Sequence, residues 1–229
     1  MIIIGLLIGG ILKGQELIQN ARISSTIAQV KGYSAATLTF QDSYKNLPGD
    51  IFAAHTLVPQ CSTTNYCGGG NGDNKVGVFD IMSFSASQAG VLTLPEIETT
   101  YFWKHLQLAG LIDGIKPYSN PASPAWGSTH PSNTLSGGGF TVYTSSSTTG
   151  IDVGRGVGVR LLKYPNSSAA DWQRSLTPLI AQKIDTKMDD GMPDSGAVQA
   201  DAAATNCDPG GIYQVSNTTP SCYMFFQLY

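Results

Sequence analysis

The hydrophobic and polar positions of residues 1–47 predict one helix made of two different parts. The first twelve residues, MIIIGLLIGGIL, contain no charge. From Lys13 onward, mostly apolar positions recur at alternating steps of three and four, which places them on one stripe of a helix. At 1.5 Å per residue this helix would be about 70 Å long, and Leu47-Pro48-Gly49 should end it. The stripe consists of Ile23, Ile27, Val30, Tyr33, Thr37, Phe40, Tyr44 and Leu47.

A helix of this length suits a protein that begins in a membrane or a helical bundle and projects a head away from it. The 229 residues contain enough material for one ordinary core besides the helix. We therefore expect a helix over 1–47 and one globular head over 48–229. The stripe should lie on a sheet. The opposite face is small and polar, with Ser24, Ser25, Ala28, Ser34 and Ala35.

Later segments predict the elements of the head. Alternating positions at 140–144 and 156–162 predict a hairpin in an antiparallel sheet, and 222–228 predicts the last strand. We expect an α+β fold, in which the long N-terminal helix packs on a sheet of about four strands with extensive loops. Helices are predicted at 96–112 (inward residues Tyr101, Leu108, Leu111 and Ile112, with Gly114 beyond its end) and 175–188. Loops are predicted at 50–77 and, over the surface, at 115–137; 78–97 is ambiguous, with a helix suggested at 80–89.

The composition indicates an extracytoplasmic protein. Only 13% of residues are charged, about half the usual share, while glycine and small hydroxyl residues are abundant. The net charge of -3 and the isoelectric point near 5.5 provide no basic surface for nucleic acid, so no nucleic-acid partner is expected.

Four cysteines all lie outside the predicted helix, and four cysteines allow three pairings. We predict local pairing, Cys61 with Cys67 and Cys207 with Cys222, because it closes two loops rich in glycine, asparagine and proline. Zinc is the competing interpretation, but the spacings lack paired C-x-x-C units and no histidine lies within five residues of a cysteine. An oxidising compartment is therefore expected.

The segment IIIGLLIGGILKGQELIQNARISSTIAQVKGYSAATLTFQDSYKNLPGD, residues 2–50, resembles the N-terminal region of type IV pilin-like proteins. Weaker similarity continues at 71–73 (NGD), 101–114 and 184–200. The resemblance implies a helical homopolymer, built with pilus or secretion assembly machinery from subunits held in the inner membrane and displayed as a cell-surface filament. The implied filament-core residues are Ile2, Ile3, Ile4, Leu6, Leu7, Ile8, Ile11 and Leu12.

The start of the chain departs from that family. Its members begin with a methylated aromatic residue, and a glutamate follows a few positions later inside the apolar stretch. Here neither is present, and Glu16 lies too far along the helix to take the glutamate's role. The uncharged run of about twelve residues is also shorter than the roughly twenty that cross a bilayer. Two explanations stay open: a buried helix end, or a membrane segment that begins before Met1, as the resemblance implies.

We expect a structural subunit of a type IV pilus-like filament. Two alternatives stay open: a pseudopilin of a type II secretion system, and a membrane-tethered adhesin or carbohydrate-binding module that uses the helix only as an anchor. No enzymatic activity is expected, because G-x-S-x-G, P-loop and H-E-x-x-H patterns are missing from the sequence. The only histidines are His55, His105 and His130.

Two acidic segments are candidates for calcium, which prefers six to eight oxygen ligands. Neither follows the order of an EF-hand loop, so capping of a helix end and turns is the competing interpretation. No other cofactor is expected. The first segment holds Asp185, Asp189, Asp190 and Asp194, and the second holds Asn71, Asp73 and Asn74.

Overall fold

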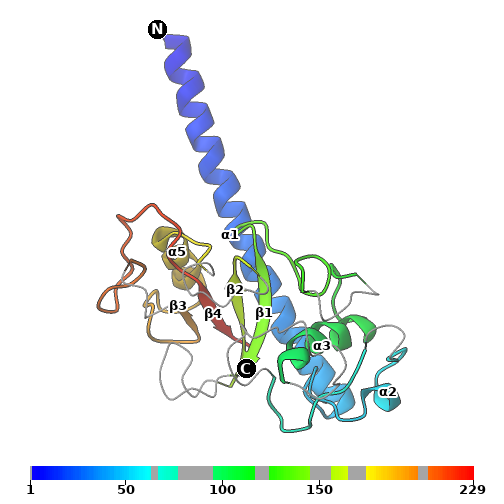
Figure 1. The fold of residues 1–229 in the computed structure, drawn as a ribbon. Coiled ribbons are helices and arrows are strands. Elements are labelled where there is room, and N and C mark those ends of the chain that lie inside the picture. Colours follow the sequence, from blue (N-terminus) through cyan, green and yellow to red (C-terminus); the bar gives the residue numbers. More distant parts are fainter. Residues whose placement is uncertain are drawn as a thin grey trace.

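A long helix and a four-stranded sheet dominate the structure, a computed structural model that describes residues 2–62, 67–76, 95–116, 124–144, 156–164, 174–200 and 206–229. Helix α1 (Ile2–Tyr44) is unbroken over 43 residues, which corresponds to about 65 Å. Its C-terminal half lies against the head, whereas its N-terminal half extends beyond it (Figure 1). The chain therefore has the predicted α+β architecture.

The predicted stripe of α1 is the side that packs on the head. Six of its eight residues are buried, and the other two, Ile27 and Tyr44, are half-buried. The buried six are Ile23, Val30, Tyr33, Thr37, Phe40 and Leu47. Thr26 and Ala36 are buried as well. Among the described side chains of α1, Ile23 is the first buried one, so the buried contact with the head begins there.

The end of α1 lies three residues before the predicted one. The helix stops at Tyr44, and Lys45 follows in the left-handed conformation with φ of 56°. A left-handed residue directs the chain out of the helix. Leu47 is therefore buried from a turn and not from the last turn of the helix.

The sheet is antiparallel with strand order β1-β2-β4-β3. β1 (Gly139–Thr144) and β2 (Val157–Leu162) form the predicted hairpin, with Gly139 opposite Leu162. β4 (Met224–Gln227) pairs with both β2 and β3 (Val198–Ala200). β4 is shorter than the predicted 222–228, because Cys222 forms only an isolated bridge with Leu176. The short strand β3 was not predicted.

One face of the sheet forms the core with α1. Alternation along each strand sends every second side chain to the same face, and on this face nearly all are apolar. The ring of Tyr33 on α1 lies edge-on to Phe140, with centroids 5.3 Å apart, and to Trp103, at 4.9 Å. Members of this face that are buried in the main core are Phe140, Val142, Val157, Val159, Leu161, Val198, Ala200, Met224 and Phe226.

Helix α3 (Pro95–Leu108) replaces the predicted helix at 96–112. It ends at a Schellman turn around Gly110, whose φ is 70°: the N–H of Leu111 donates to the carbonyl of Leu106, and the N–H of Gly110 to that of Gln107. Gly110, not Gly114, is thus the C-terminal glycine. The predicted inward set was also partly wrong. Tyr101 is buried, but Leu108, Leu111 and Ile112 are only half-buried, whereas Phe102, Trp103 and Leu106 are fully buried.

Three further predictions need correction, and one cannot be compared. The predicted loop at 50–77 contains the short helix α2 (Ala54–Leu57). Within 115–137, His130, Pro131 and Asn133 are buried, because Asn133 donates hydrogen bonds to Thr26 and Gln29 of α1. Helix α5 (Pro178–Met188) begins after the predicted Ser175, and its N-cap Thr177 makes no side-chain capping bond. The helix suggested at 80–89 lies outside the described residues.

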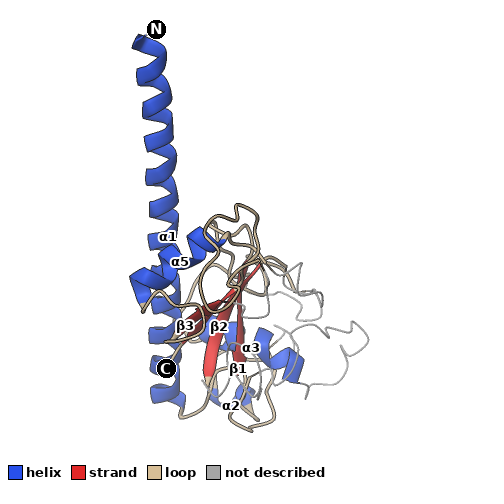
Figure 2. Cartoon of the chain, turned by 90° about the vertical axis from the view of Figure 1, so that its left-hand side faces the viewer, coloured by secondary structure: helices blue, strands red, loops and turns tan. Residues whose placement is uncertain are grey.

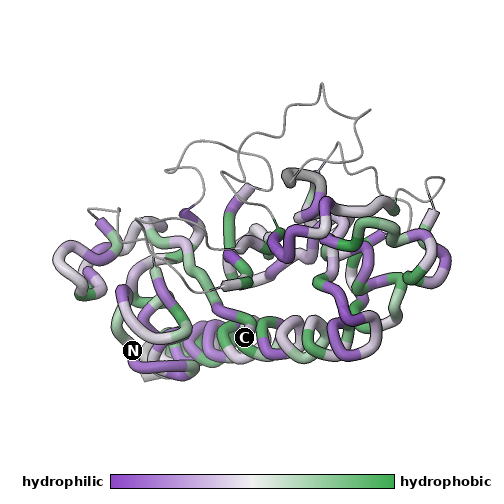
Figure 3. Tube along the Cα trace, turned by 90° about the horizontal axis from the view of Figure 1, so that it is seen from below, coloured by the Kyte–Doolittle hydropathy of each residue, from purple (hydrophilic) through white to green (hydrophobic). Residues whose placement is uncertain are grey.

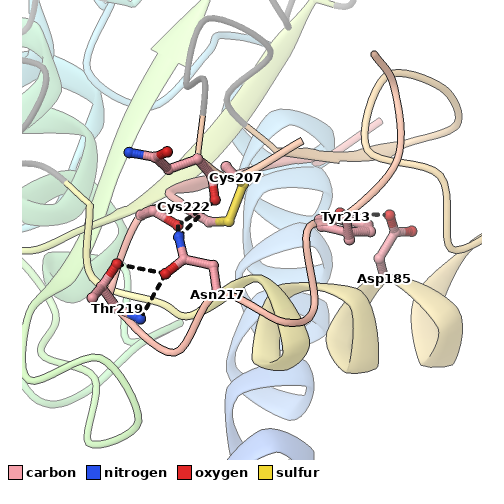
Figure 4. Close-up of a disulfide and its surroundings, with 8 residues drawn as sticks. Asp185, Cys207, Tyr213, Asn217, Thr219 and Cys222 are labelled. Atoms are coloured by element: carbon pink, nitrogen blue, oxygen red, sulfur yellow. Dashed lines mark hydrogen bonds between the residues drawn. A yellow bond between two sulfur atoms is a disulfide. The ribbon is translucent and has the colours of Figure 1, made fainter. Parts of the chain in front are cut away.

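The cysteines pair locally, as predicted: Cys61 with Cys67 and Cys207 with Cys222. The second bond closes a segment that Asn217 organises (Figure 4). The Asn217 side chain donates to the carbonyl of Asn206 and accepts from both the N–H and the hydroxyl of Thr219. The disulfide and this polar network together order a segment with little secondary structure.

Removing the second disulfide should cost more stability than removing the first. The Cys207–Cys222 bond spans 15 positions and the Cys61–Cys67 bond spans 6. The chain-entropy model then gives losses of about 3 and about 2 kcal/mol, respectively. Urea unfolding of the two double-alanine variants beside the wild-type chain measures both values. Equal losses, or a larger loss for the first bond, would show that loop closure does not govern the contribution of these bonds.

Candidate functional site

The N-terminal part of α1 is an apolar surface without a partner in the described part of the chain. We call residues 4–18 the projecting segment. Its described large apolar side chains are each 54–62% exposed, and six of the seven lie on one broad side of the helix, whereas Leu17 lies on another. Figures 1 and 2 show this part of the helix standing clear of the head. The exposed side chains are Ile4, Leu7, Ile8, Ile11, Leu12, Leu17 and Ile18.

An exposed apolar surface of this kind indicates an interaction site. Soluble monomers rarely present large contiguous apolar patches to water, and such patches mark sites that contact another protein or a membrane. Five of the eight predicted filament-core residues lie in this exposed set. The side chains of the other three, Ile2, Ile3 and Leu6, are outside the described ones. Within the described ranges, none of the helices is both long enough and apolar enough to cross a membrane.

The only charges of the projecting segment, Lys13 and Glu16, pair with each other. The Lys13 Nζ lies 2.7 Å from Oε2 of Glu16, and both side chains are exposed. The hydrogen bond and the positive charge of Lys13 lower the pKa of Glu16. Because the pair is already formed within one helix, it enters a packed environment as a neutral unit, which costs much less than burying one charge.

The face of α1 that points away from the head continues as a bare surface past residue 18. Figure 3 shows the head lying to one side of the helix. Ser24, Ala28 and Ala35 are exposed on the far side. At Gly32 an added Cβ would have no neighbouring atom within 4 Å among the described residues. A glycine inside a helix costs about 1 kcal/mol relative to alanine, and packing within this chain does not require it here.

At the end of α5, three of the four predicted calcium ligands come together. One carboxylate oxygen each of Asp185, Asp189 and Asp190 lies within 4.8 Å of the others. Asp194 is not part of this group and lies beside Gly211. The three carboxylates accept hydrogen bonds from the turn that follows the helix. The donors are Gly191 N–H and the Tyr213 hydroxyl for Asp185, Ala197 and Val198 N–H for Asp189, and Met192 N–H and the Ser195 hydroxyl for Asp190.

These hydrogen bonds organise the turn in the way that the capping interpretation predicted, while calcium stays a prediction. Asp185 is fully buried, and its Oδ2 accepts the hydroxyl proton of Tyr213 at 2.7 Å (Figure 4). Burial raises the pKa of Asp185 to about 6, and the nearby charges of Asp190 and Asp189 act in the same direction.

The raised pKa makes the stability of the head depend on pH. The folded chain holds the Asp185 proton more tightly than the unfolded chain, so this contribution is complete below the ordinary pKa of 3.8 and is lost as the pH rises through about 6. Asp185→Asn should remove a decrease on the order of 2 kcal/mol between these pH values. Urea unfolding at pH 4 and pH 7 measures it, with Asp194→Asn as the control. An unchanged pH dependence in Asp185→Asn would contradict this assignment.

The second acidic segment does not gather its own side chains around a common point. Asn71 and Asp73 each accept a hydrogen bond from the backbone N–H two residues later. The loop is instead held by Asp50, which the sequence did not single out as a ligand of this loop. The Asp50 carboxylate accepts the N–H groups of Gly72 and Asn74. Burial raises the pKa of Asp50, and these two hydrogen bonds oppose that effect.

Two of the three histidines, His105 and His130, are buried, and two of the tryptophans, Trp103 and Trp126, have contacts within the head. His105 is fully buried; its Nδ1 accepts the N–H of Gly49, and its Nε2–H donates to the carbonyl of Gly68. Burial lowers the pKa of His105 to about 4 and that of His130 to about 3. Trp103 is in the core, and Trp126 donates its indole N–H to the carbonyl of Lys163.

Known proteins were compared with the chain at three levels. Models of protein families, curated proteins and solved structures contain no match to it. The projecting segment is therefore the feature on which a functional proposal rests.

Proposed function

We propose that this protein is the structural subunit of a type IV pilus-like filament, and that subunits polymerise through the projecting segment while the head stays exposed. The observation that carries this proposal is the set of exposed large apolar side chains in the projecting segment. About 22 Å of helix presents these apolar side chains outside the head. The same apolar segment of other subunits can bury this surface by helix–helix packing.

The way the head is attached supports the same function. The buried contact between α1 and the core begins at Ile23. Other subunits can therefore pack around the projecting segment without a rearrangement of the head. The bare far side of the helix, with Ala28, Gly32 and Ala35, lets a neighbouring helix approach closely, because small residues reduce the distance between helix axes. The disulfides suit the oxidising exterior in which such a filament would lie.

Electron microscopy of surface filaments tests the proposal. The full chain is produced in cells that have pilus assembly machinery, surface material is sheared off, and fibres are imaged at a resolution that identifies this sequence. We expect fibres with projecting segments buried in the centre and heads outside. Dispersed subunits, with residues 4–18 facing water or folded onto the head, would contradict the proposal.

The alternatives predict different outcomes of this experiment. A pseudopilin would form a short filament that stays in the periplasm. A tethered adhesin or carbohydrate-binding module would remain membrane-associated as single copies and give no fibre at any expression level. Fractionation by detergent extraction, followed by size measurement, separates these cases.

A further inference from the structure

The loop at 71–74 contains the only Asn-Gly pair in the chain, Asn71-Gly72. Such a pair can react with itself: the backbone nitrogen of the glycine attacks Cγ of the asparagine, ammonia leaves, and a succinimide forms. Water then opens the ring to aspartate or isoaspartate. Glycine permits this cyclisation because it has no Cβ to hinder the approach. Asn71 and Gly72 are both exposed, so water and base reach the pair.

The side-chain carbonyl of Asn71, which is the electrophile of this reaction, already accepts an activating hydrogen bond. Oδ1 of Asn71 accepts the N–H of Asp73 at 2.8 Å. A donor at this oxygen polarises the side-chain carbonyl and stabilises the negative charge that develops there during attack. The conformation of Asn71 thus favours reaction at Cγ once a nucleophile is available.

The nucleophilic half is restrained by Asp50. The N–H of Gly72 donates to Oδ1 of Asp50 at 2.7 Å, and the other carboxylate oxygen accepts the N–H of Asn74. Attack requires loss of the Gly72 proton, which would place a second negative charge beside the carboxylate. The same hydrogen bond fixes the orientation of the Gly72 peptide group.

Asp50 is held firmly enough to act in this way. It is buried, and the preceding Gly49 donates its N–H to His105. Gly70 packs against the backbone of Asp50, where an added Cβ would lie 2.6 Å from its Cα. The N–H of Asn71 also donates to Oε1 of Glu98 at 2.9 Å. The loop must therefore open before Gly72 N is free to attack.

We propose that Asn71 is a latent deamidation site and that Asp50 keeps it unreactive in the folded chain. The product would carry a new carboxylate at residue 71, next to Asp73 and close to Glu98 and Asp50. Repulsion among these carboxylates destabilises the closed conformation of the loop. A chain modified in this way therefore stays in the open conformation. It requires no reactant besides water.

Peptide mass spectrometry of the full, oxidised chain tests this proposal. At mildly alkaline pH, Asn71 should deamidate at least about tenfold more slowly in the folded chain than in urea, which corresponds to about 1.4 kcal/mol of loop opening. Asn74, followed by lysine, is the internal reference within the same loop. Equal rates in the two states would overturn the proposal.

The role of Asp50 is tested with Asp50→Asn. In this variant, deamidation of the folded chain should approach the rate seen in urea. A folded variant that reacts no faster than wild type would overturn the role of Asp50. If the variant does not fold, hydrogen exchange of the Gly72 amide in the wild-type chain decides: protection supports the proposal, and exchange at the unprotected rate overturns it.

Discussion

Ile11→Asp should abolish filament formation while leaving the head folded. Ile11 lies in the projecting segment, 61% exposed, and twelve positions before Ile23, where the core begins. In the single chain the new carboxylate therefore meets water and costs only the lower helix propensity of aspartate, about 0.5 kcal/mol. Inside a bundle of helices the same carboxylate would be buried without a partner, which costs several kcal/mol for every subunit. Counting sheared fibres by electron microscopy measures the effect.

The chain offers a matched control in Ile212→Asp. Ile212 is 66% exposed on the head, in the segment closed by Cys207 and Cys222. The chemical change and the exposure are nearly the same, but the position lies away from the projecting segment. This variant should form fibres in wild-type numbers at equal protein levels by immunoblot. Fibres made by Ile11→Asp would contradict burial of the projecting segment, and loss of fibres in both variants would point to a contact through the head.

Phe40→Ala should produce the largest loss of stability that a single change in α1 causes in the head. The Phe40 side chain is fully buried. Its ring centroid lies 4.4 Å from that of Tyr44 and 6.1 Å from that of His105. Truncation removes apolar burial and leaves a cavity between α1 and α3, with an expected cost of about 3–5 kcal/mol. Total stabilities of domains are about 5–15 kcal/mol, so much of the head's margin would be lost.

Leu38→Ala is the control two residues away on the same helix. Leu38 is 48% exposed on the side opposite the core, so its truncation should cost less than about 1 kcal/mol. Urea unfolding of both full-length variants, followed by tryptophan fluorescence, measures the difference. Similar losses for the two variants would show that the head does not depend on the stripe of α1.

The local pattern of apolar residues was sufficient to predict helices and strands that place their apolar side chains on one face. The three-four spacing from Ile23 to Tyr44 indicated both the existence of α1 and the face that it buries, because a helix repeats every 3.6 residues. Alternation at 140–144 and 156–162 indicated the hairpin for the same kind of reason. Helix ends were predicted less well: Lys45 and Gly110 stop α1 and α3 through left-handed conformations that other residues nearby could also have adopted.

The sequence by itself determined the long two-part helix, the α+β class and, through the short spacing of the cysteines, the disulfide pairing. Only the tertiary structure decided which distant residues meet. β3 has three residues and becomes a strand through pairing with β4; Asp50 reaches a loop more than twenty residues away; and the Asp185 carboxylate is buried against Tyr213. Periodicity reports which side of an element is apolar, whereas such contacts depend on how whole elements pack, and no local pattern contains that information.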